Sequence, residues 1–289
     1  DLRAVFTGSE GALGVVTEAT LRVRPTPTVR RYEGWSFPSF GSGLRAFRRL
    51  VQEGVAPDVL RLSDAEETRV TLLLAGRAGL ALRAYQAARG QHGGCLAIVG
   101  WESTSERVVR ARRTLTRAVV KDAGGIALGA GVGASWLHGR YDAPYLRDAL
   151  LDAGALAETL ETASDWSGLR DLHADVRRAV RDALAEQGTP PIVLTHVSHA
   201  YPTGASLYVT VIARRSGDPG AQWWPAKRAA MDAITTAGAT ITHHHAVGSD
   251  HTPWLQDEIG ALGLETLRAV KEVVDPRGIM NPGTLLPHP

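Results

Sequence analysis

Two adjoining segments decide the fold, Trp35-Ser36-Phe37 and Phe40-Gly41-Ser42-Gly43-Leu44-Arg45-Ala46-Phe47-Arg48-Arg49-Leu50-Val51-Gln52-Glu53. The first is a short apolar run of the kind found in buried strands. In the second, the spacing of Leu44, Phe47, Leu50 and Val51 would place all four on one face of a helix. The pair therefore predicts a strand followed by a helix that packs its apolar face against a sheet.

The same alternation of apolar runs and amphipathic segments continues toward the C-terminus. Strands are expected at 57–62 and 96–101, and helices at 65–74 and 105–122, with Gly124-Gly125 ending the second helix. This rhythm is typical of the β-α-β-β-α-β order of ferredoxin-like folds. We therefore predict an α+β fold, a ferredoxin-like antiparallel sheet with helices packed on it.

The remaining elements are predicted from the same signals. Strands are expected at 192–199 and 206–214, joined by a turn at 201–204, and 240–245 has the pattern of a strand end. Helices are expected at 144–162, 169–187, 225–237, 254–262 and 264–274. Gly188 and the segment Asp275-Pro276-Arg277-Gly278 supply helix stops.

Composition excludes several classes of function. The 289 residues carry 32 basic and 30 acidic side chains without a block of like charge, which argues against a nucleic-acid partner. No apolar run approaches the ~18 residues that cross a bilayer, so we expect no transmembrane segment, while contact with a membrane surface stays open. Cys95 lies in an apolar run, and a lone thiol of this kind is usually a core residue. It fits a reducing cytoplasm, and the preference for Arg over Lys hints at a bacterial source.

Three glycines fall within the segment Gly8-Ser9-Glu10-Gly11-Ala12-Leu13-Gly14. Glycines allow a backbone to approach a ligand and to aim N–H groups at phosphate, although such a stretch is more often a plain hairpin turn. No Gly-Lys-Ser/Thr follows, which excludes a Walker loop, and glycines that precede a strand do not make a Rossmann fingerprint. The β-branched residues at 15–23 predict that strand, and Pro25 and Pro27 end it.

The run His243-His244-His245 is the densest group of titratable side chains in the chain. At a strand end, alternation would place two of these rings on one face and the third on the other. His-x-His pairs can bind a metal, histidines can relay protons or hold an anion, and a merely His-rich surface loop is the third interpretation. Clustering of titratable groups favours a functional role. Because only Asp250 is nearby as a carboxylate ligand, we assign no metal.

Three further side chains are candidates for a site. Tyr208 lies on the strand that follows the segment His196-Val197-Ser198-His199-Ala200-Tyr201, and the two together form a candidate constellation. The tyrosine lies on the opposite strand face from Leu207 and Val209, where a tyrosine is usually half-buried core. Arg61 interrupts an apolar strand, so its charge needs a partner, and a phosphate or carboxylate ligand held by its forked donors would serve. Arg147 is the third candidate, although most arginines are solvated surface residues.

Together these segments resemble the alkyldihydroxyacetonephosphate synthase family, within the vanillyl-alcohol-oxidase superfamily of flavoproteins. The stretch 6–20 resembles the end of the superfamily's PCMH-type FAD-binding domain. The ending 275–283 resembles a motif that is likewise shared across the whole superfamily. Four parts of the chain resemble the synthase family more specifically: 56–62, 145–148 with 161–166, 204–208 and 242–248. The chain departs from the family in lacking the N-terminal flavin-binding half, in placing His251 where basic residues are usual, and in ending at Pro289 without a peroxisomal Ser-Lys-Leu signal.

The resemblance implies a division of the chain into three parts. Residues 1–27 would be the C-terminal end of the FAD-binding domain, 28–270 a substrate-binding cap domain, and 271–289 a tail that returns to the FAD domain. FAD is the implied cofactor, contacted by Gly8, Ser9, Glu10, Gly11, Gly14, Val15, Val16, Thr17 and Glu18. The implied catalytic residues are Tyr208, His243, His244, His245 and Arg61, and Arg147 is implied to bind substrate.

The implied reaction exchanges the acyl chain of acyl-dihydroxyacetonephosphate for a fatty alcohol through an adduct at flavin N5, a step of ether lipid synthesis. Tyr208 would act as the base if the histidines make its hydroxyl more acidic. The alternative on the same fold is an FAD-dependent 2-hydroxy-acid dehydrogenase or oxidase of the D-lactate or glycolate type. A third possibility is a cap domain that is inactive without a separate FAD-binding chain. Expected partners are a lipid-phosphate or hydroxy-acid substrate, the N-terminal FAD-binding half and a second copy in a homodimer.

Overall fold

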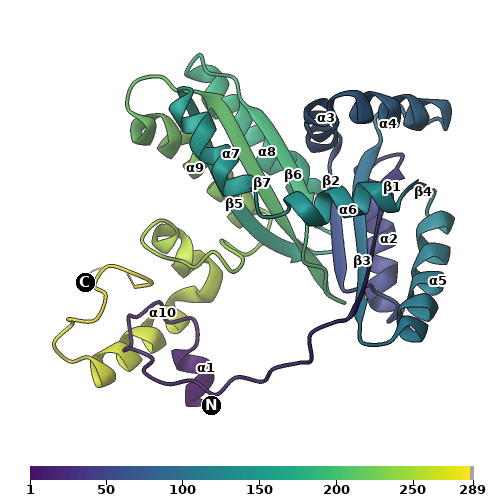
Figure 1. Cartoon of the computed structure of the whole chain (residues 1–289). Coiled ribbons are helices and arrows are strands. Elements are labelled where there is room, and N and C mark those ends of the chain that lie inside the picture. Colours follow the sequence, from purple (N-terminus) through teal and green to yellow (C-terminus); the bar gives the residue numbers. More distant parts are fainter. Residues whose placement is uncertain (287–289) are drawn as a thin grey trace.

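One antiparallel sheet of seven strands runs through the molecule (Figure 1). The computed structural model describes residues 1–286, without the side chains of Ala143 and Pro144. The strands are β1 (Val29–Phe37), β2 (Val59–Ser63), β3 (Cys95–Ser103), β4 (Ile126–Gly129), β5 (Ala155–Asp165), β6 (Ile192–Val197) and β7 (Gly204–Arg214). Their order across the sheet is β4-β1-β3-β2-β6-β7-β5, and every neighbouring pair is antiparallel. The predicted α+β class is confirmed.

The sheet consists of two ferredoxin-like units placed edge to edge. The first runs β1, α2 (Phe40–Gln52), β2, α3 (Ala65–Leu74), α4 (Gly76–Ala88), β3, α5 (Glu106–Asp122), β4. The second runs β5, α8 (Leu169–Glu186), β6, β7, α9 (Pro219–Thr236), and a bridge from Thr240 to Ala163 stands where its fourth strand would lie. The units join through β2 and β6, at the pairs Leu62–Val197 and Ser63–His196.

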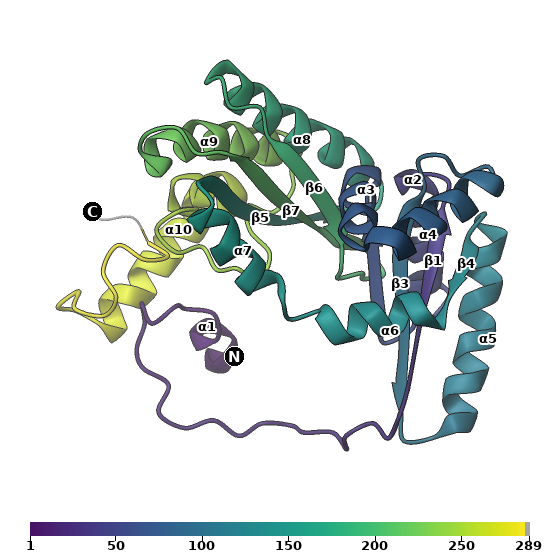
Figure 2. The same ribbon diagram turned by 45° about the horizontal axis from the view of Figure 1, so that its top comes forward.

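The two faces of the sheet are covered differently, because side chains alternate along each strand. The face of Leu62, Val197 and Leu207 is fully buried beneath helices that include α2, α8 and α9. Two further helices, α6 (Ala130–Gly139) and α7 (Ala143–Asp152), lie on the other face, over β1 and β5 (Figures 1 and 2). Between them Tyr208, Thr210 and Ile212, which alternate along β7 on this face, are only half buried, so this second face has room for a site.

Most predicted elements are confirmed to within a few residues. The helix α3 occupies the predicted range, and α2, α5 and α8 differ from their predicted ranges by one residue at one end. The two predicted C-terminal helices form α10 (Leu255–Val274), broken at Gly260 with φ 75°, after the short helix η1 (Thr252–Trp254). The elements missed are α1 (Leu2–Phe6), α4, β4 and α6. Cys95 is buried as expected, and burial raises the pKa of its thiol to about 12.

Three predictions of secondary structure are wrong. Residues 15–23 are extended but exposed and form no ladder, because no strand among residues 1–286 lies beside them. The predicted helix 144–162 ends at Asp152, where Gly154 turns the chain with φ 81°, and β5 then pairs with β7 along its whole length. Only Thr240 of the segment 240–245 makes a bridge, so the histidine run lies in a loop. Within residues 1–286 no helix is both long and apolar enough to cross a membrane.

Candidate functional site

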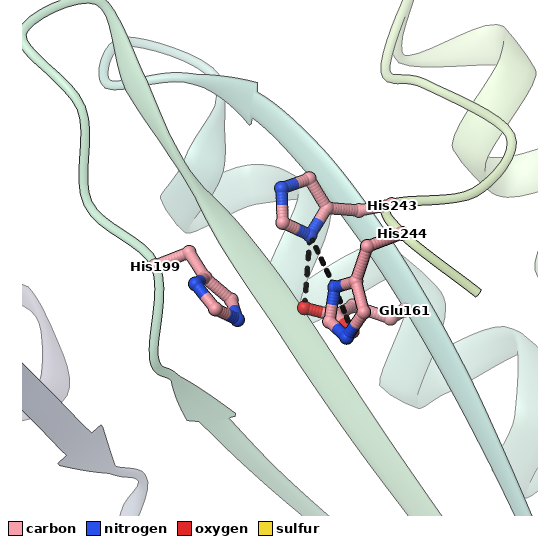
Figure 3. Close-up of side chains that lie close together, drawn as sticks. All are labelled: Glu161, His199, His243 and His244. Atoms are coloured by element: carbon pink, nitrogen blue, oxygen red, sulfur yellow. Dashed lines mark hydrogen bonds and ion pairs between the residues drawn. The ribbon is translucent and has the colours of Figure 1, made fainter. Parts of the chain in front are cut away.

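The centre of the candidate site is a carboxylate that the sequence did not single out, Glu161 on β5. Its side chain is fully buried, yet it contacts three imidazoles. His243 Nδ1 lies 3.1 Å from Oε1, while His244 Nδ1 and His245 Nε2 lie 3.2 and 3.1 Å from Oε2. His199 lies on the other side of the group, 5.2 Å from His243 between ring centroids and tilted against it (Figure 3). All three members of the predicted histidine run therefore converge on one buried charge.

The backbone of the loop explains this convergence. His244 and Ala246 both have positive φ, 42° and 74°, which few residues other than glycine adopt readily. The amide of His243 donates to the carbonyl of Glu161 at 3.1 Å, and the amide of His245 donates to the carbonyl of His243 at 2.7 Å. The chain is thus tightly turned beside β5. The predicted division of the rings between two strand faces is wrong, because the histidines are not on a strand.

Tyr208 lies next to this group on the open face of the sheet. It pairs with Glu161 across β5 and β7 and with His196 across β6 and β7, so the three side chains project from the same face. Its ring stacks on His196 at 4.8 Å and meets the edge of His245 at 5.4 Å. The tyrosine is therefore held between two imidazoles while its own side chain is only half buried.

Arg61 supports the same face from β2. The sequence predicted a partner for its charge, and that partner is Glu67 of α3 rather than a ligand. The second oxygen of Glu67 lies 3.2 Å from His196 Nδ1. Burial raises the pKa of Glu67, but His196 and Arg61 outweigh it and lower the pKa to about 2. Glu67, ionised at neutral pH, thus fixes the ring on which Tyr208 stacks.

The histidines that flank Tyr208 are neutral near pH 7. Burial lowers the pKa of His196, and Glu67 opposes this only in part. Burial likewise lowers the pKa of His199 and His245, against the opposing charge of Glu161. A neutral imidazole can accept a proton and pass it on. The site therefore combines one buried anion with several unprotonated bases.

Arg147 is not brought into this group. It lies on α7, half exposed, with its guanidinium 3.8 Å from Glu158 of β5. Within residues 1–286 it makes no hydrogen bond or ion pair with the histidines or Tyr208. Its predicted role in binding substrate stays a prediction.

The glycine-rich turn reaches the site through Glu10. One oxygen of that carboxylate accepts from the amide of Val247 and the other from the amide of Gly248, both at 2.7 Å. The side chain predicted to contact cofactor is thus occupied in holding the histidine loop. The Asn281 amide donates to the Glu10 carbonyl, and Lys271 donates to the Ala12 carbonyl at 2.6 Å. Gly8, Ser9, Gly11 and Gly14 form the turn, whereas Val15, Val16, Thr17 and Glu18 continue it as exposed extended chain.

Comparison with known proteins identifies the family of this chain. The model of the C-terminal domain of FAD linked oxidases matches residues 26–285. This chain belongs to that family. It is 32% identical, over its whole length, to alkyldihydroxyacetonephosphate synthase of Trypanosoma brucei brucei, and covers 49% of that protein. It is 30% identical over 98% of its length to the synthase of Dictyostelium discoideum, of which it covers 48%.

A solved structure of an alkyldihydroxyacetonephosphate synthase has the same fold. It superposes with a TM-score of 0.78 at 28% identity, over 98% of this chain and 50% of the other. The chain spans about half the length of the curated relatives that it matches. The match confirms the predicted resemblance and the predicted fold of a C-terminal FAD-linked oxidase domain.

Membership of the family makes FAD the cofactor, and the turn at 8–14 fits one wall of a flavin site. Gly8 and Gly11 have φ of 83° and 76°, and no heavy atom lies within 4 Å of the position that a Cβ on Gly8 would occupy. A ligand could therefore approach this backbone closely. Through Glu10 the same turn is tied to the histidine loop, so a flavin held there would lie beside the histidines.

Four side chains of the same group could also bind a metal ion. Ligand atoms of Glu161, His199, His243 and His244 all lie within 4.8 Å of one another (Figure 3). Three nitrogens and one oxygen at this separation form a donor set that suits zinc or a similar divalent ion.

Glu161 and Glu67 were not predicted as members of the site, and His196 was noted only within the segment 196–201 that precedes Tyr208. Glu161 lay in a segment predicted to be helical, so its pairing with Tyr208 could not be seen. Glu67 lies at the start of α3 and looked like an ordinary acidic first turn. His196 did stand beside His199 in a predicted strand, and its register opposite Tyr208 was the available signal. Tyr201, whose hydroxyl lies 3.0 Å from His243 Nε2, was noted in the same segment and in a turn, but it was not chosen as a site residue.

Proposed function

We propose that this chain forms the substrate half of an FAD-dependent transferase that exchanges the acyl chain of acyl-dihydroxyacetonephosphate for a fatty alcohol. The observation that carries the proposal is the position of Tyr208, between the neutral rings of His196 and His245 and beside buried Glu161. In this proposal residues 1–27 and 271–289 belong with the flavin-binding half, and residues 28–270 form the substrate-binding cap.

The exchange requires a proton to leave the substrate carbon that carries the acyl oxygen, next to the ketone. Tyr208 is the proposed base, because its hydroxyl projects from the open face of the sheet. As the Tyr208 oxygen takes the substrate proton, its own hydroxyl proton can pass to a histidine of the group, whose ring is neutral and adjacent. Glu161 stabilises the imidazolium that forms, since its carboxylate contacts the ring at 3.1 Å.

The remaining steps return this proton. The bond between the substrate carbon and the acyl oxygen breaks, and the fatty acid leaves as a carboxylate with both bonding electrons. The flavin nitrogen N5, when FAD is bound, would fill the vacated position on that carbon until the fatty alcohol replaces it. The fatty alcohol then forms a new bond from its oxygen to the same carbon and loses its hydroxyl proton to a neutral histidine. One proton goes back to the substrate carbon and one is released with the carboxylate, so substrate and product stay at the same oxidation level.

FAD and the two arginines have the remaining roles, in chemistry, in substrate binding and in orienting the site. FAD, when bound, supplies the reactive nitrogen N5 for this chemistry. Arg147 is proposed to hold the substrate phosphate through its forked donors. Arg61 acts indirectly, because its guanidinium neutralises Glu67 and so keeps His196 in contact with Tyr208.

The test is an anaerobic assay of the purified, flavin-loaded protein. With acyl-dihydroxyacetonephosphate and a labelled fatty alcohol, label should enter an alkyl ether product while the flavin stays oxidised at the end. A 2-hydroxy-acid dehydrogenase would instead bleach its flavin with D-lactate or glycolate and form no ether. Bleaching without ether formation would reject the proposal.

A further inference from the structure

We propose that Tyr201 is a second catalytic residue of this site and removes the hydroxyl proton of the incoming fatty alcohol. The inference rests on the transfer reaction proposed above, which needs two proton acceptors, one for the substrate carbon and one for the alcohol. Tyr208 serves the carbon. The contacts of Tyr201 identify the acceptor for the alcohol.

A chain of two hydrogen bonds connects the Tyr201 hydroxyl to the buried carboxylate of the site. The hydroxyl oxygen lies 3.0 Å from His243 Nε2, and His243 Nδ1 lies 3.1 Å from Glu161 Oε1 (Figure 3). Because a carboxylate only accepts, an uncharged His243 ring carries its proton on Nδ1 and donates it to Glu161. Nε2 is then an acceptor, and the Tyr201 hydroxyl donates to it. The ring is therefore placed to take a proton from the phenol.

The two oxygens of Glu161 serve different tyrosines. Oε1 contacts His243, which is hydrogen-bonded to Tyr201. Oε2 contacts His245, whose ring meets Tyr208 edge-on. Among the side chains that the structure describes in residues 1–286, Tyr201 has the one hydroxyl that is hydrogen-bonded to a ring of the histidine run. Each phenol thus has an imidazole of its own, and both imidazoles contact one buried anion.

Tyr201 is open to a ligand although its backbone is fixed. The residue is 44% exposed and stands in the tight turn between β6 and β7. Its amide donates to the carbonyl of Gly204 at 2.8 Å, and its carbonyl accepts from the Trp166 indole at 2.9 Å. Neither bond involves the hydroxyl. The turn therefore holds the phenol beside His243 and would keep its shape if only the hydroxyl were removed.

The chain from Tyr201 to Glu161 accounts for the proton that the fatty alcohol loses. The alcohol O–H bond breaks as its proton moves to the Tyr201 oxygen, and the proton of the phenol moves to His243 Nε2. The bonding electron pair stays on the alcohol oxygen, which uses it to form the bond to the substrate carbon. Glu161 stabilises the imidazolium of His243. This proton is the one released with the fatty-acid carboxylate.

Direct transfer from the alcohol to His243 fits the contacts less well. The side chain of His243 is 18% exposed, and its Nε2 is already hydrogen-bonded to Tyr201. Its Nδ1 faces the buried Glu161. An alcohol therefore reaches this imidazole through the phenol.

The experiment separates release of the fatty acid from attack by the alcohol. The purified flavin-loaded protein is mixed with acyl-dihydroxyacetonephosphate labelled in its acyl chain, and the fatty acid released in one turnover is measured without alcohol. Hexadecanol is then added and the ether product is measured. In Tyr201→Phe we expect the same release as in the parent, while ether formation falls by about 10²- to 10⁴-fold, the usual contribution of a general base. Y208F should lose the release itself.

A more acidic alcohol distinguishes a base from a structural support. Fluorine on the carbon next to the hydroxyl-bearing carbon of hexadecanol makes its proton leave with less help. The loss in Y201F relative to the parent should therefore be smaller with the fluorinated alcohol. A loss of the same size with both alcohols would overturn the assignment, because disturbed packing of His243 does not depend on the acidity of the alcohol.

The matched control is Tyr85→Phe on α4. This change removes a hydroxyl that also has a hydrogen bond, from Arg89 at 3.2 Å, at a similar exposure of 38%. Y85F should match the parent in both measurements. Ether formation by Y201F at the parent's rate would overturn the role of Tyr201 and leave the transfer reaction standing, and so would loss of fatty-acid release in Y201F. A parent that released no fatty acid and formed no ether would reject the transfer reaction, and the role of Tyr201 with it.

Discussion

Glu161 and Tyr208 occupy paired positions on β5 and β7, and the next paired position, on β6, holds His196. Three neighbouring strands thus place an anion, a phenol and an imidazole in one row on the open face of the sheet. The histidine loop closes over one end of this row and Arg61 with Glu67 supports the other. A site built on strands holds its groups more rigidly than one built on loops.

Replacing Tyr208 by phenylalanine should abolish the proton transfer and leave the fold intact. The ring still stacks on His196, so only the hydroxyl is lost. We expect ether formation to fall by about 10²- to 10⁴-fold, the usual contribution of a general base. Flavin content and thermal unfolding should match the parent protein. Tyr85→Phe, an exposed position on α4, is the control. Full turnover by Y208F would exclude Tyr208 as the base.

Replacing Glu161 by glutamine should move the pH dependence of the reaction. Burial lowers the pKa of His199 and His245, and the Glu161 charge is what raises it back toward the ordinary value. Without that charge both pKa values fall further, so the histidines stay unprotonated to lower pH. The acid limb of kcat/KM against pH should therefore shift to lower pH while its plateau decreases. Glu265→Gln, exposed on α10, should change neither. An unshifted acid limb would mean that these histidines do not titrate in the reaction.

Local patterns predicted the helices and the central strands, because amphipathic spacing in α2, α5 and α8 reports directly on the face that each buries. Only part of the candidate site could be predicted from the sequence. Tyr208 and the histidines attract attention by residue type, whereas Glu161 matters because of its neighbours across the sheet. The segment around it has a helix-compatible composition, and 11 residue pairs with β7 make it a strand. Such long-range pairing overrides local propensity and cannot be read from a short window.

Arg61 and Glu67 should behave as one unit in stability measurements. Arg61→Ala leaves the carboxylate of Glu67 without its cation in a largely buried position. Breaking a buried pair costs 3–5 kcal/mol, and because Arg61 is 24% exposed we expect roughly 2–3 kcal/mol from urea unfolding. In R61A/E67Q the uncompensated charge is gone, so the double variant should be more stable than R61A alone. Additive losses would show that the two residues do not interact.

The free energy of unfolding should fall as the pH drops below about 6.5, the pKa of histidine in an unfolded chain. Burial lowers the pKa of His196 in the folded protein. Between the two values the unfolded chain binds a proton that the folded protein does not, so acid favours unfolding. One such histidine contributes up to about 1.4 kcal/mol per pH unit. His196→Asn, whose amide can still donate to Glu67, should flatten this slope. His92→Gln, at an exposed position, should not, and an unchanged slope in H196N would assign the effect to other groups.

Removing the Glu10 carboxylate should loosen the histidine loop without disturbing the sheet. Its two oxygens accept from the part-buried amides of Val247 and Gly248 at 2.7 Å. A fully buried amide left without a partner costs about 1–3 kcal/mol, so we expect a cost toward the lower end of that range here. In Glu10→Ala we expect faster hydrogen exchange at these two amides, with β5 and β7 as protected as before. Turnover should fall with the loop's order. The control Glu18→Ala changes an exposed acid on the extended segment nearby and should leave exchange in the loop unaltered. Unchanged exchange at Val247 and Gly248 in E10A would show that the loop keeps its shape without Glu10, and the carboxylate would then be free for the cofactor contact that the sequence predicted.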